Sequence, residues 1–325
     1  MFALAITGPT ASGKTAISLP VAKALGCEII CCDSMQIYKE MSIGTAKATA
    51  EERSVVPHYM LDFLSPTEDY SVESYRTDAL NTAKEMISRG VRPMFVGGTG
   101  LYLDALTRAQ ATDVPESGRE YRDGILQNIK TEEDIDALWQ RLYSVDPESA
   151  TAIHKNNVRR VIRALEIYDA TGKTKSYFDR LSREARGDID IGMITLDFHD
   201  RENLYRRVDM RVDIMMREGL LEEVRSLYER GLLIEKTTAA QAIGYKEIVS
   251  YLEGKTTLSE AVELIKLSSR RYAKRQLTWF RHKESEKLFI DDENGVMKER
   301  DALICEAMLI AEKLIKDSQI RNEIN

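Results

Sequence analysis

The feature that most constrains the fold of this chain is an eight-residue segment near its start, GPTASGKT, which begins at Gly8. It fits the pattern G-x-x-x-x-G-K-[ST] in a suitable context. The apolar stretch Phe2–Thr7 before it is typical of a buried strand, and Ala16–Leu25 after it is typical of a helix. In such a loop the backbone N–H groups point inward, and the helix N-terminus adds partial positive charge. The segment therefore predicts a polyphosphate site, with an ordinary glycine-rich turn as the alternative.

Two side chains of this loop have specific expected roles. Lys14 would reach the terminal phosphate, and the Thr15 hydroxyl would bind Mg2+. The residues expected to surround the phosphates are Gly8, Pro9, Thr10, Ala11, Ser12, Gly13, Lys14 and Thr15. The pattern indicates a polyphosphate but does not by itself indicate ATP hydrolysis.

Strands and helices alternate over the first hundred residues. Further strands are expected at Glu28–Cys32 and at Met94–Val96, and the latter runs into Gly97–Gly100 and a helical segment. This order predicts an α/β fold with a doubly wound parallel sheet, P-loop NTPase-like, whose ligands bind beyond the carboxyl ends of the strands. Pro20 should kink its helix or cost about 3 kcal/mol.

The middle of the chain differs from both ends. Residues 113–188 are polar and helical in pattern, and Ile191–Phe198 then returns as a strand. We therefore expect a catalytic core made of residues 1–112 and 189–325, with residues 113–188 as a helical insertion domain. The last twenty residues or so are expected to form a peripheral helix.

Composition narrows the class further. The 325 residues carry a net charge of −7 and are 43% hydrophobic, which is normal for a globular protein. No run of about 18 apolar residues predicts a membrane span, and the start of the chain has no secretory signal pattern. The cysteines at 27, 31, 32 and 305 form no C-x-x-C pair. A cytoplasmic protein with reduced, buried thiols is expected.

Asp33 follows an apolar strand at the edge where ligands should bind. A carboxylate in that place could act as general base for an acceptor nucleophile. It could equally be a turn or helix N-cap residue, which is common after strands.

The segment Asn203–Gly219 has a helical pattern in which Leu204 and Arg211, seven residues apart, share the apolar face. An unpaired guanidinium on that face is costly, so Arg211 needs an anion. A diphosphate is one candidate because arginine binds it through two hydrogen bonds. The alternative is an arginine–carboxylate pair.

Two basic clusters stand out in this acidic chain. Arg159, Arg160 and Arg163 alternate with apolar residues, and Arg270–Lys283 holds six basic residues and no acidic one. Tyr272 and Trp279 flank the apolar stripe of the second cluster. Basic helices with aromatic residues can bind a nucleic-acid backbone and stack on bases. Solvated helix faces are the alternative.

Taken together, these motifs resemble those of the tRNA dimethylallyltransferase family, also called tRNA isopentenyltransferases, over nearly the whole chain. The absence of a zinc-finger extension suggests the bacterial type. The matching segments are GPTASGKT at 8, DSMQIY at 33, IGTAK at 43, PHYMLD at 57, VGGTGLY at 96, IHKNNVRRVIRALE at 153, LYRRVDMRVDIMMREGLLEEV at 204, QAIGYKE at 241 and RRYAKRQLTWFR at 270.

The resemblance implies transfer of a dimethylallyl group from dimethylallyl diphosphate to N6 of the adenosine 3′ of the anticodon, with the base flipped from its stack. Asp33 would act as the general base. Thr10, Lys14 and Arg211 would hold the diphosphate, and Thr15 would place Mg2+. The residues that would contact the anticodon stem-loop are Asp33, Ser34, Met35, Gln36, Thr99, Arg122, Arg159, Arg160, Val161, Ile162, Arg163, Gln241, Ala242, Ile243, Gly244, Tyr245 and Lys246.

Departures from the family pattern leave some of these contacts open. Many relatives carry a polar or basic residue in place of Met35, and Arg119 could substitute for Arg122.

A monomer with no obligate protein partner and no membrane association is expected.

Two other function classes share parts of this pattern. A small-molecule kinase using ATP would share the loop, Asp33 and Mg2+ but leave both basic clusters unexplained. A non-catalytic nucleotide- or tRNA-binding module would leave Asp33 and Arg211 without a reason. A GTPase is not expected, because the sequence has no N-K-x-D motif.

Overall fold

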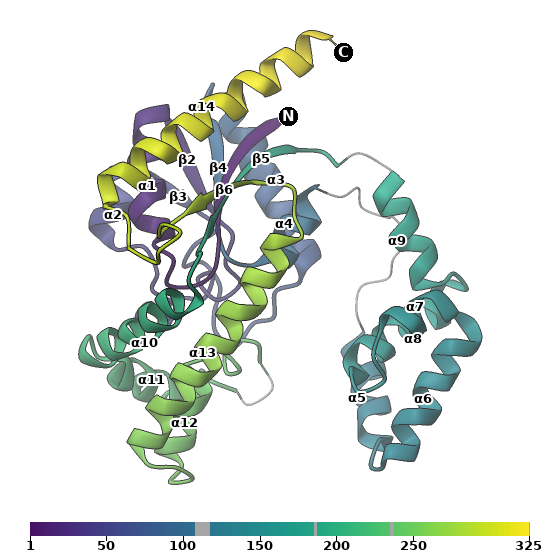
Figure 1. Ribbon diagram of the computed structural model, residues 1–325. Helices are drawn as coiled ribbons and strands as arrows, with labels where there is room; N and C mark the ends of the chain where they lie inside the picture. Colours follow the sequence, from purple (N-terminus) through teal and green to yellow (C-terminus); the bar gives the residue numbers. More distant parts are fainter. Residues whose placement is uncertain (108–117, 185–186, 235–236, 325) are drawn as a thin grey trace. The chain divides into compact units, whose positions relative to one another are not determined.

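The computed structural model describes residues 1–107, 118–184, 187–234 and 237–324. The chain divides into two compact units, one made of Met1–Leu106 with Ile189–Asn325 and the other of Thr107–Asp188. Figure 1 shows the elements of each unit along the chain. The boundary expected between residues 112 and 113 lies outside the described residues.

The larger unit contains a six-stranded sheet in the order β3-β2-β4-β1-β5-β6, and every neighbouring pair of strands is parallel. This confirms the predicted α/β class. The strands are β1 (Phe2–Thr7), β2 (Cys27–Cys31), β3 (His58–Tyr59), β4 (Arg92–Gly97), β5 (Asp190–Asp197) and β6 (Glu286–Phe289).

Helices fall into both units. Those of the larger unit are α1 (Lys14–Leu25), α2 (Ala50–Val55), α3 (Val72–Ser88), α4 (Gly100–Thr107), α10 (Arg201–Arg217), α11 (Leu220–Glu229), α12 (Tyr245–Leu252), α13 (Leu258–Arg281) and α14 (Arg300–Ile324). Those of the smaller unit are α5 (Arg119–Asn128), α6 (Glu132–Val145), α7 (Pro147–Ala152), α8 (Val158–Thr171) and α9 (Lys175–Glu184).

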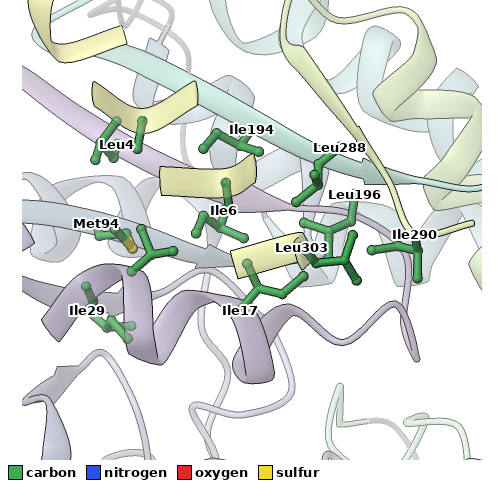
Figure 2. Packing of buried hydrophobic residues seen from close by; sticks show 14 of the residues in the cluster. Leu4, Ile6, Ile17, Ile29, Met94, Ile194, Leu196, Leu288, Ile290 and Leu303 are labelled. Carbon is green, nitrogen blue, oxygen red and sulfur yellow. The ribbon is translucent and has the colours of Figure 1, made fainter. Parts of the chain in front are cut away.

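Alternate strand residues point to opposite sides of the sheet, and helices cover both of these faces. Leu4 and Ile6 of β1 belong to one core cluster, with residues of α1 and α14, and Ala3 and Ala5 belong to another, with residues of α3 and α4. Figure 2 shows the first cluster, in which strand residues meet Ile17 and Leu303. The sheet is therefore doubly wound.

A third cluster joins α10, α11, α12 and α13 to the segment after β2, which contributes Ile37, Tyr38 and Met41. Figure 1 shows these helices beyond one end of the sheet. The smaller unit has its own core, which includes Leu142, Val161 and Leu165. Its described elements are all helices, as the sequence predicted for this part of the chain.

Two strands and one helix depart from the sequence expectations. The edge strands β3 and β6 span only two and four residues, too few for a pattern to show. The last helix is not peripheral as expected, because Leu303, Ala307 and Ala311 of α14 are buried in the first core cluster. The predicted strand Phe2–Thr7 coincides with β1, and the other predicted strands differ from β2, β4 and β5 by one or two residues at their ends.

Pro20 lies inside α1, which continues on both sides of it. Proline has no N–H to donate to the carbonyl four residues earlier, here that of Ala16. The Arg300 guanidinium of α14 donates to this carbonyl at 3.3 Å. The tertiary structure therefore supplies a donor for a group that the proline leaves unpaired.

In the described part of the chain, no helix is both long enough and apolar enough to span a membrane.

Candidate functional site

The phosphate loop joins β1 to α1 and is held closely by its surroundings. Gly8 has φ +143°, and a Cβ added there would lie 2.9 Å from the Leu196 carbonyl oxygen, so the close packing of β1 on β5 requires glycine. Ala11 has φ +62°, which is unfavourable for a residue with a side chain. Its carbonyl accepts a hydrogen bond from Arg207 Nε at 2.8 Å. The loop conformation is thus maintained by tertiary contacts.

Lys14 is the first residue of α1 and folds back over the loop. Its Nζ donates to the carbonyl oxygens of Gly8 at 3.1 Å and Pro9 at 2.8 Å. Burial and the nearby Arg211 guanidinium lower the pKa of Lys14 to about 8, an effect that the Asp33 carboxylate partly offsets. The site therefore has an excess of positive charge, which an anion would relieve.

The rest of the loop differs in exposure. The Ser12 hydroxyl is buried, and no described residue is its hydrogen-bond partner. Thr10, Ala11, Gly13, Lys14 and Thr15 line an adjacent cavity of about 860 Å³. Gly8, Pro9 and Ser12 do not line it.

Asp33 follows β2 and faces this cavity. Its Oδ1 accepts a hydrogen bond from the Met35 backbone N–H at 2.9 Å, which is the turn geometry offered as an alternative above. That bond leaves the second carboxylate oxygen available to a ligand. The turn and base roles are therefore compatible in one side chain.

The residues after Asp33 also reach the cavity, and Thr99 supports them. The Ser34 backbone N–H donates to Thr99 Oγ1 at 3.1 Å. Met35 packs partly against the third core cluster. Gln36 Nε2 donates to the Thr45 carbonyl at 3.0 Å. Ser34, Met35 and Gln36 line the cavity, whereas Thr99 does not line it and supports this segment through its hydrogen bond to Ser34.

Arg211 lies on the buried stripe of α10, between Val208 and Val212, as the spacing predicted. Its Nη2 donates to the Thr45 carbonyl at 3.3 Å, and among the described residues no carboxylate lies within 4.0 Å of it. Burial lowers the pKa of this guanidinium, while Asp33 opposes the shift. The arginine–carboxylate pair offered as the alternative is absent from the described part of the chain.

The segment before α12 and the first turn of α12 form another wall of the cavity, made by Gln241, Ala242, Ile243, Gly244 and Lys246. Tyr245 is different, since it is fully buried and its hydroxyl donates to Glu223 Oε1 at 2.6 Å. The same carboxylate accepts from the backbone N–H groups of Ser42, Ile43 and Gly44. Tyr245 therefore anchors the loop that carries Thr45.

The basic stretch Arg270–Lys283, most of which lies in α13, has residues with two different roles. Arg270 is paired with Asp209, Arg281 with Asp197 and Lys283 with Asp104. Trp279 packs against Gly100, where an added Cβ would lie 2.5 Å from its ring. These positions of the predicted nucleic-acid surface stabilise the fold instead. Those that line the cavity are Arg271, Tyr272 and Arg275.

The predicted contacts of the smaller unit lie mainly on α8. Arg159 and Arg160 are exposed, whereas Val161 and Ile162 are each 1% exposed and belong to the interior. Arg163 forms an ion pair with Glu166 at 2.8 Å. Arg122 Nε donates to the Gly118 carbonyl at 3.3 Å on α5. The side chain of the alternative, Arg119, lies outside the described residues.

Sequence reasoning missed Gln276, which bonds to the phosphate loop and lines the cavity. The signal was available, because Ala273, Gln276, Leu277 and Phe280 share one helical face. It also missed the role of Glu223, for which no local pattern exists.

The fold and this cavity define a P-loop protein of the NTPase-like α/β class, with a carboxylate facing the loop. Residues 36–283 match the family model described as IPP transferase, and residues 1–62 match one described as isopentenyl transferase. The chain belongs to the IPP transferase family, as the motifs suggested.

Curated relatives are similar in sequence to this protein over most of the chain. The tRNA dimethylallyltransferase of Bacillus cereus strain AH187 is 49% identical over 280 residues, which is 86% of each protein. That of Thermoanaerobacter sp. strain X514 is 45% identical over 289 residues, 88% of this chain and 91% of that protein.

Solved structures show the same likeness. The full-length tRNA isopentenylpyrophosphate transferase of Bacillus halodurans is 41% identical with a TM-score of 0.71, and the match covers 98% of both chains. A eukaryotic dimethylallyltransferase acting on tRNA is 31% identical with a TM-score of 0.75, covering 89% of this chain and 73% of that one.

Proposed function

We propose that this protein transfers a dimethylallyl group from dimethylallyl diphosphate to N6 of the tRNA adenosine 3′ of the anticodon, and releases diphosphate. The observation that carries the proposal is the convergence of Lys14 and Arg211 with Asp33 in one cavity. The cations suit a diphosphate, and the carboxylate suits the acceptor amine. The family membership of the chain supports the same reaction.

In this mechanism the bond between C1 of the donor and its diphosphate oxygen breaks, and its electron pair remains on the diphosphate. Lys14, Arg211 and the loop N–H groups stabilise the charge that develops there. A new bond forms between C1 and N6, and Asp33 accepts the N6 proton. The five-carbon chain would lie against the apolar wall of Val212 and Met215 on α10.

Mg2+ fits the oxygen ligands of this site. The Thr15 side chain lines the cavity beside Lys14 and would bind the ion together with diphosphate oxygens. When bound, Mg2+ neutralises charge on the leaving diphosphate.

The RNA would contact the cavity rim and the exposed arginines. Arg271 and Arg275 of α13 border the cavity in the larger unit, together with Gln241–Gly244 and Lys246. Arg159 and Arg160 of α8 offer a second basic surface in the smaller unit. The chain would act as a monomer without an obligate protein partner.

The test is a transfer assay with radiolabelled dimethylallyl diphosphate, Mg2+ and unmodified tRNA, run beside an ATP control. We expect label on the adenosine next to the anticodon and no ATP consumption. Stoichiometric ADP without labelled tRNA would replace this proposal with a small-molecule kinase.

A further inference from the structure

A glutamine occupies the buried stripe of α13. Gln276 is 6% exposed and lies on the same helical face as Ala273, Leu277 and Phe280. A primary amide on such a face costs free energy unless both its oxygen and its nitrogen are hydrogen-bonded.

Both ends of this amide have backbone partners. Gln276 Oε1 accepts from the Thr10 N–H at 2.8 Å, and Nε2 donates to the Gly98 carbonyl at 2.8 Å. The orientation of the amide is unambiguous, because a backbone N–H can only donate and a carbonyl can only accept. Thr10 lies in the phosphate loop after β1, and Gly98 follows the adjacent strand β4. One side chain therefore joins two loops at the ligand-binding edge of the sheet.

The surrounding backbone is shaped to admit this amide. A Cβ at position 98 would lie 2.3 Å from Gln276 Nε2, so a side chain there would displace the end of the glutamine from its two hydrogen bonds.

We propose that Gln276 is a positioning residue for the donor site, which holds the phosphate loop against the loop after β4 before a diphosphate binds. The identity of that ligand rests on the proposed function. Preorganisation of this kind raises ligand affinity, because the loop loses little freedom when the ligand arrives.

The first test compares wild type with Gln276→Met, which has a similar length but cannot form either hydrogen bond. Calorimetric titration of the full chain with inorganic diphosphate and Mg2+ should show affinity reduced roughly tenfold, while tRNA affinity is unchanged. Gln319→Met makes the same chemical change at an exposed position of α14 and should bind diphosphate like wild type.

A second variant supplies a readout that a purely structural role would not move. In Gln276→Glu the ionised carboxylate can accept from Thr10 but cannot donate to Gly98, whereas the protonated form can do both. Its diphosphate affinity relative to wild type should therefore recover as pH falls. Lys14, Asp33, Arg207 and Arg211 surround the loop in both proteins, so each affinity is compared with that of wild type at the same pH.

The outcomes separate this inference from the proposed function. Failure of the wild type to bind diphosphate would overturn both. Wild-type binding with undiminished affinity in Gln276→Met would overturn only the role of Gln276. If Gln276→Met does not fold by circular dichroism, a pH-independent affinity ratio for Gln276→Glu is the overturning result.

Discussion

At the scale of single residues, the site is an arrangement of charges that lack mutual compensation. Burial and the nearby Arg211 guanidinium destabilise the charged form of Lys14, burial destabilises that of Arg211, and Asp33 offsets these effects only in part. Each of the three residues stands out in the sequence for a different reason: a motif, a helical stripe and the end of a strand. Their joint role can be inferred only from the tertiary structure, in which all three side chains face one cavity.

Asp33→Asn should separate chemistry from binding. The amide oxygen can still accept from the Met35 N–H, so the turn should persist, but the amide cannot take up a proton. We expect transfer to fall by about 10²–10⁴-fold with tRNA affinity nearly unchanged, as measured by single-turnover kinetics and filter binding. Asp213→Asn, on the exposed side of α10, is the matched control. Wild-type turnover in Asp33→Asn would remove Asp33 from the mechanism.

The lowered pKa of Lys14 predicts proton-linked binding. The free protein holds this lysine near pKa 8, and a bound diphosphate should raise the pKa toward its ordinary value of 10.5. Above pH 8, binding should therefore take up protons, and affinity should fall as pH rises through this range.

Calorimetry at pH 8.5 in buffers of different ionisation enthalpy measures this uptake. Lys14→Met corrects for titration of the diphosphate itself. Equal proton uptake in both proteins would contradict the prediction.

At the scale of elements, polar side chains on apolar helix faces mark the site. Arg211 interrupts the stripe of α10, and Gln276 interrupts that of α13. Each is tolerated because it has a carbonyl, an N–H or a ligand to bind. Helix α1 shows the converse. Pro20 removes a hydrogen-bond donor from this helix, and the Arg300 guanidinium of α14 replaces it.

Pro20→Ala should stabilise the fold. Alanine restores the helix hydrogen bond to the Ala16 carbonyl and has the highest helix propensity, so we expect a gain of about 1–3 kcal/mol in the free energy of unfolding. Chemical denaturation measures the change. In the Pro20→Ala background, Arg300→Met should cost less stability than in wild type. Unchanged or lower stability of Pro20→Ala would show that the proline is already fully accommodated.

At the scale of the whole molecule, the two units carry different parts of the proposed reaction. The cavity, the phosphate loop, Asp33 and Arg211 all belong to the larger unit. The smaller unit contributes exposed basic residues on α8, with its own core beneath them. Donor binding should therefore be separable from RNA binding.

Replacing both Arg159 and Arg160 with alanine tests this division. Both are exposed, and among the described residues no carboxylate lies within 4.0 Å of either. We expect tRNA affinity to fall roughly tenfold at low salt, with a shallower salt dependence, because phosphate contacts release counterions. Affinity for inorganic diphosphate should stay at the wild-type level.

Arg141→Ala is the control in the same unit, because Arg141 is already paired with Asp169 at 2.7 Å. Undiminished tRNA affinity in the double variant would leave α8 as a solvated face.

Much of the fold was predictable because its signals are local. The strand–loop–helix at Gly8–Thr15 and the stripe of α10 follow from spacing within short segments. The edge strands β3 and β6 were not predictable, because strands this short show no periodic pattern of apolar residues. The burial of α14 was not predicted either, because the place of a helix at the end of the sequence does not indicate which surface of the core it packs against.

What the sequence by itself determined is the doubly wound class, the phosphate loop and the residues that could do chemistry, because each depends on neighbours within a few turns or a single motif. Only the tertiary structure decided which basic residues of Arg270–Lys283 pair with aspartates and which face the cavity, since their partners lie 61 to 179 residues away in the chain. It also decided that Gln276 bonds to the phosphate loop, 266 residues distant. Such contacts depend on how separate elements pack against one another, which local sequence patterns do not record.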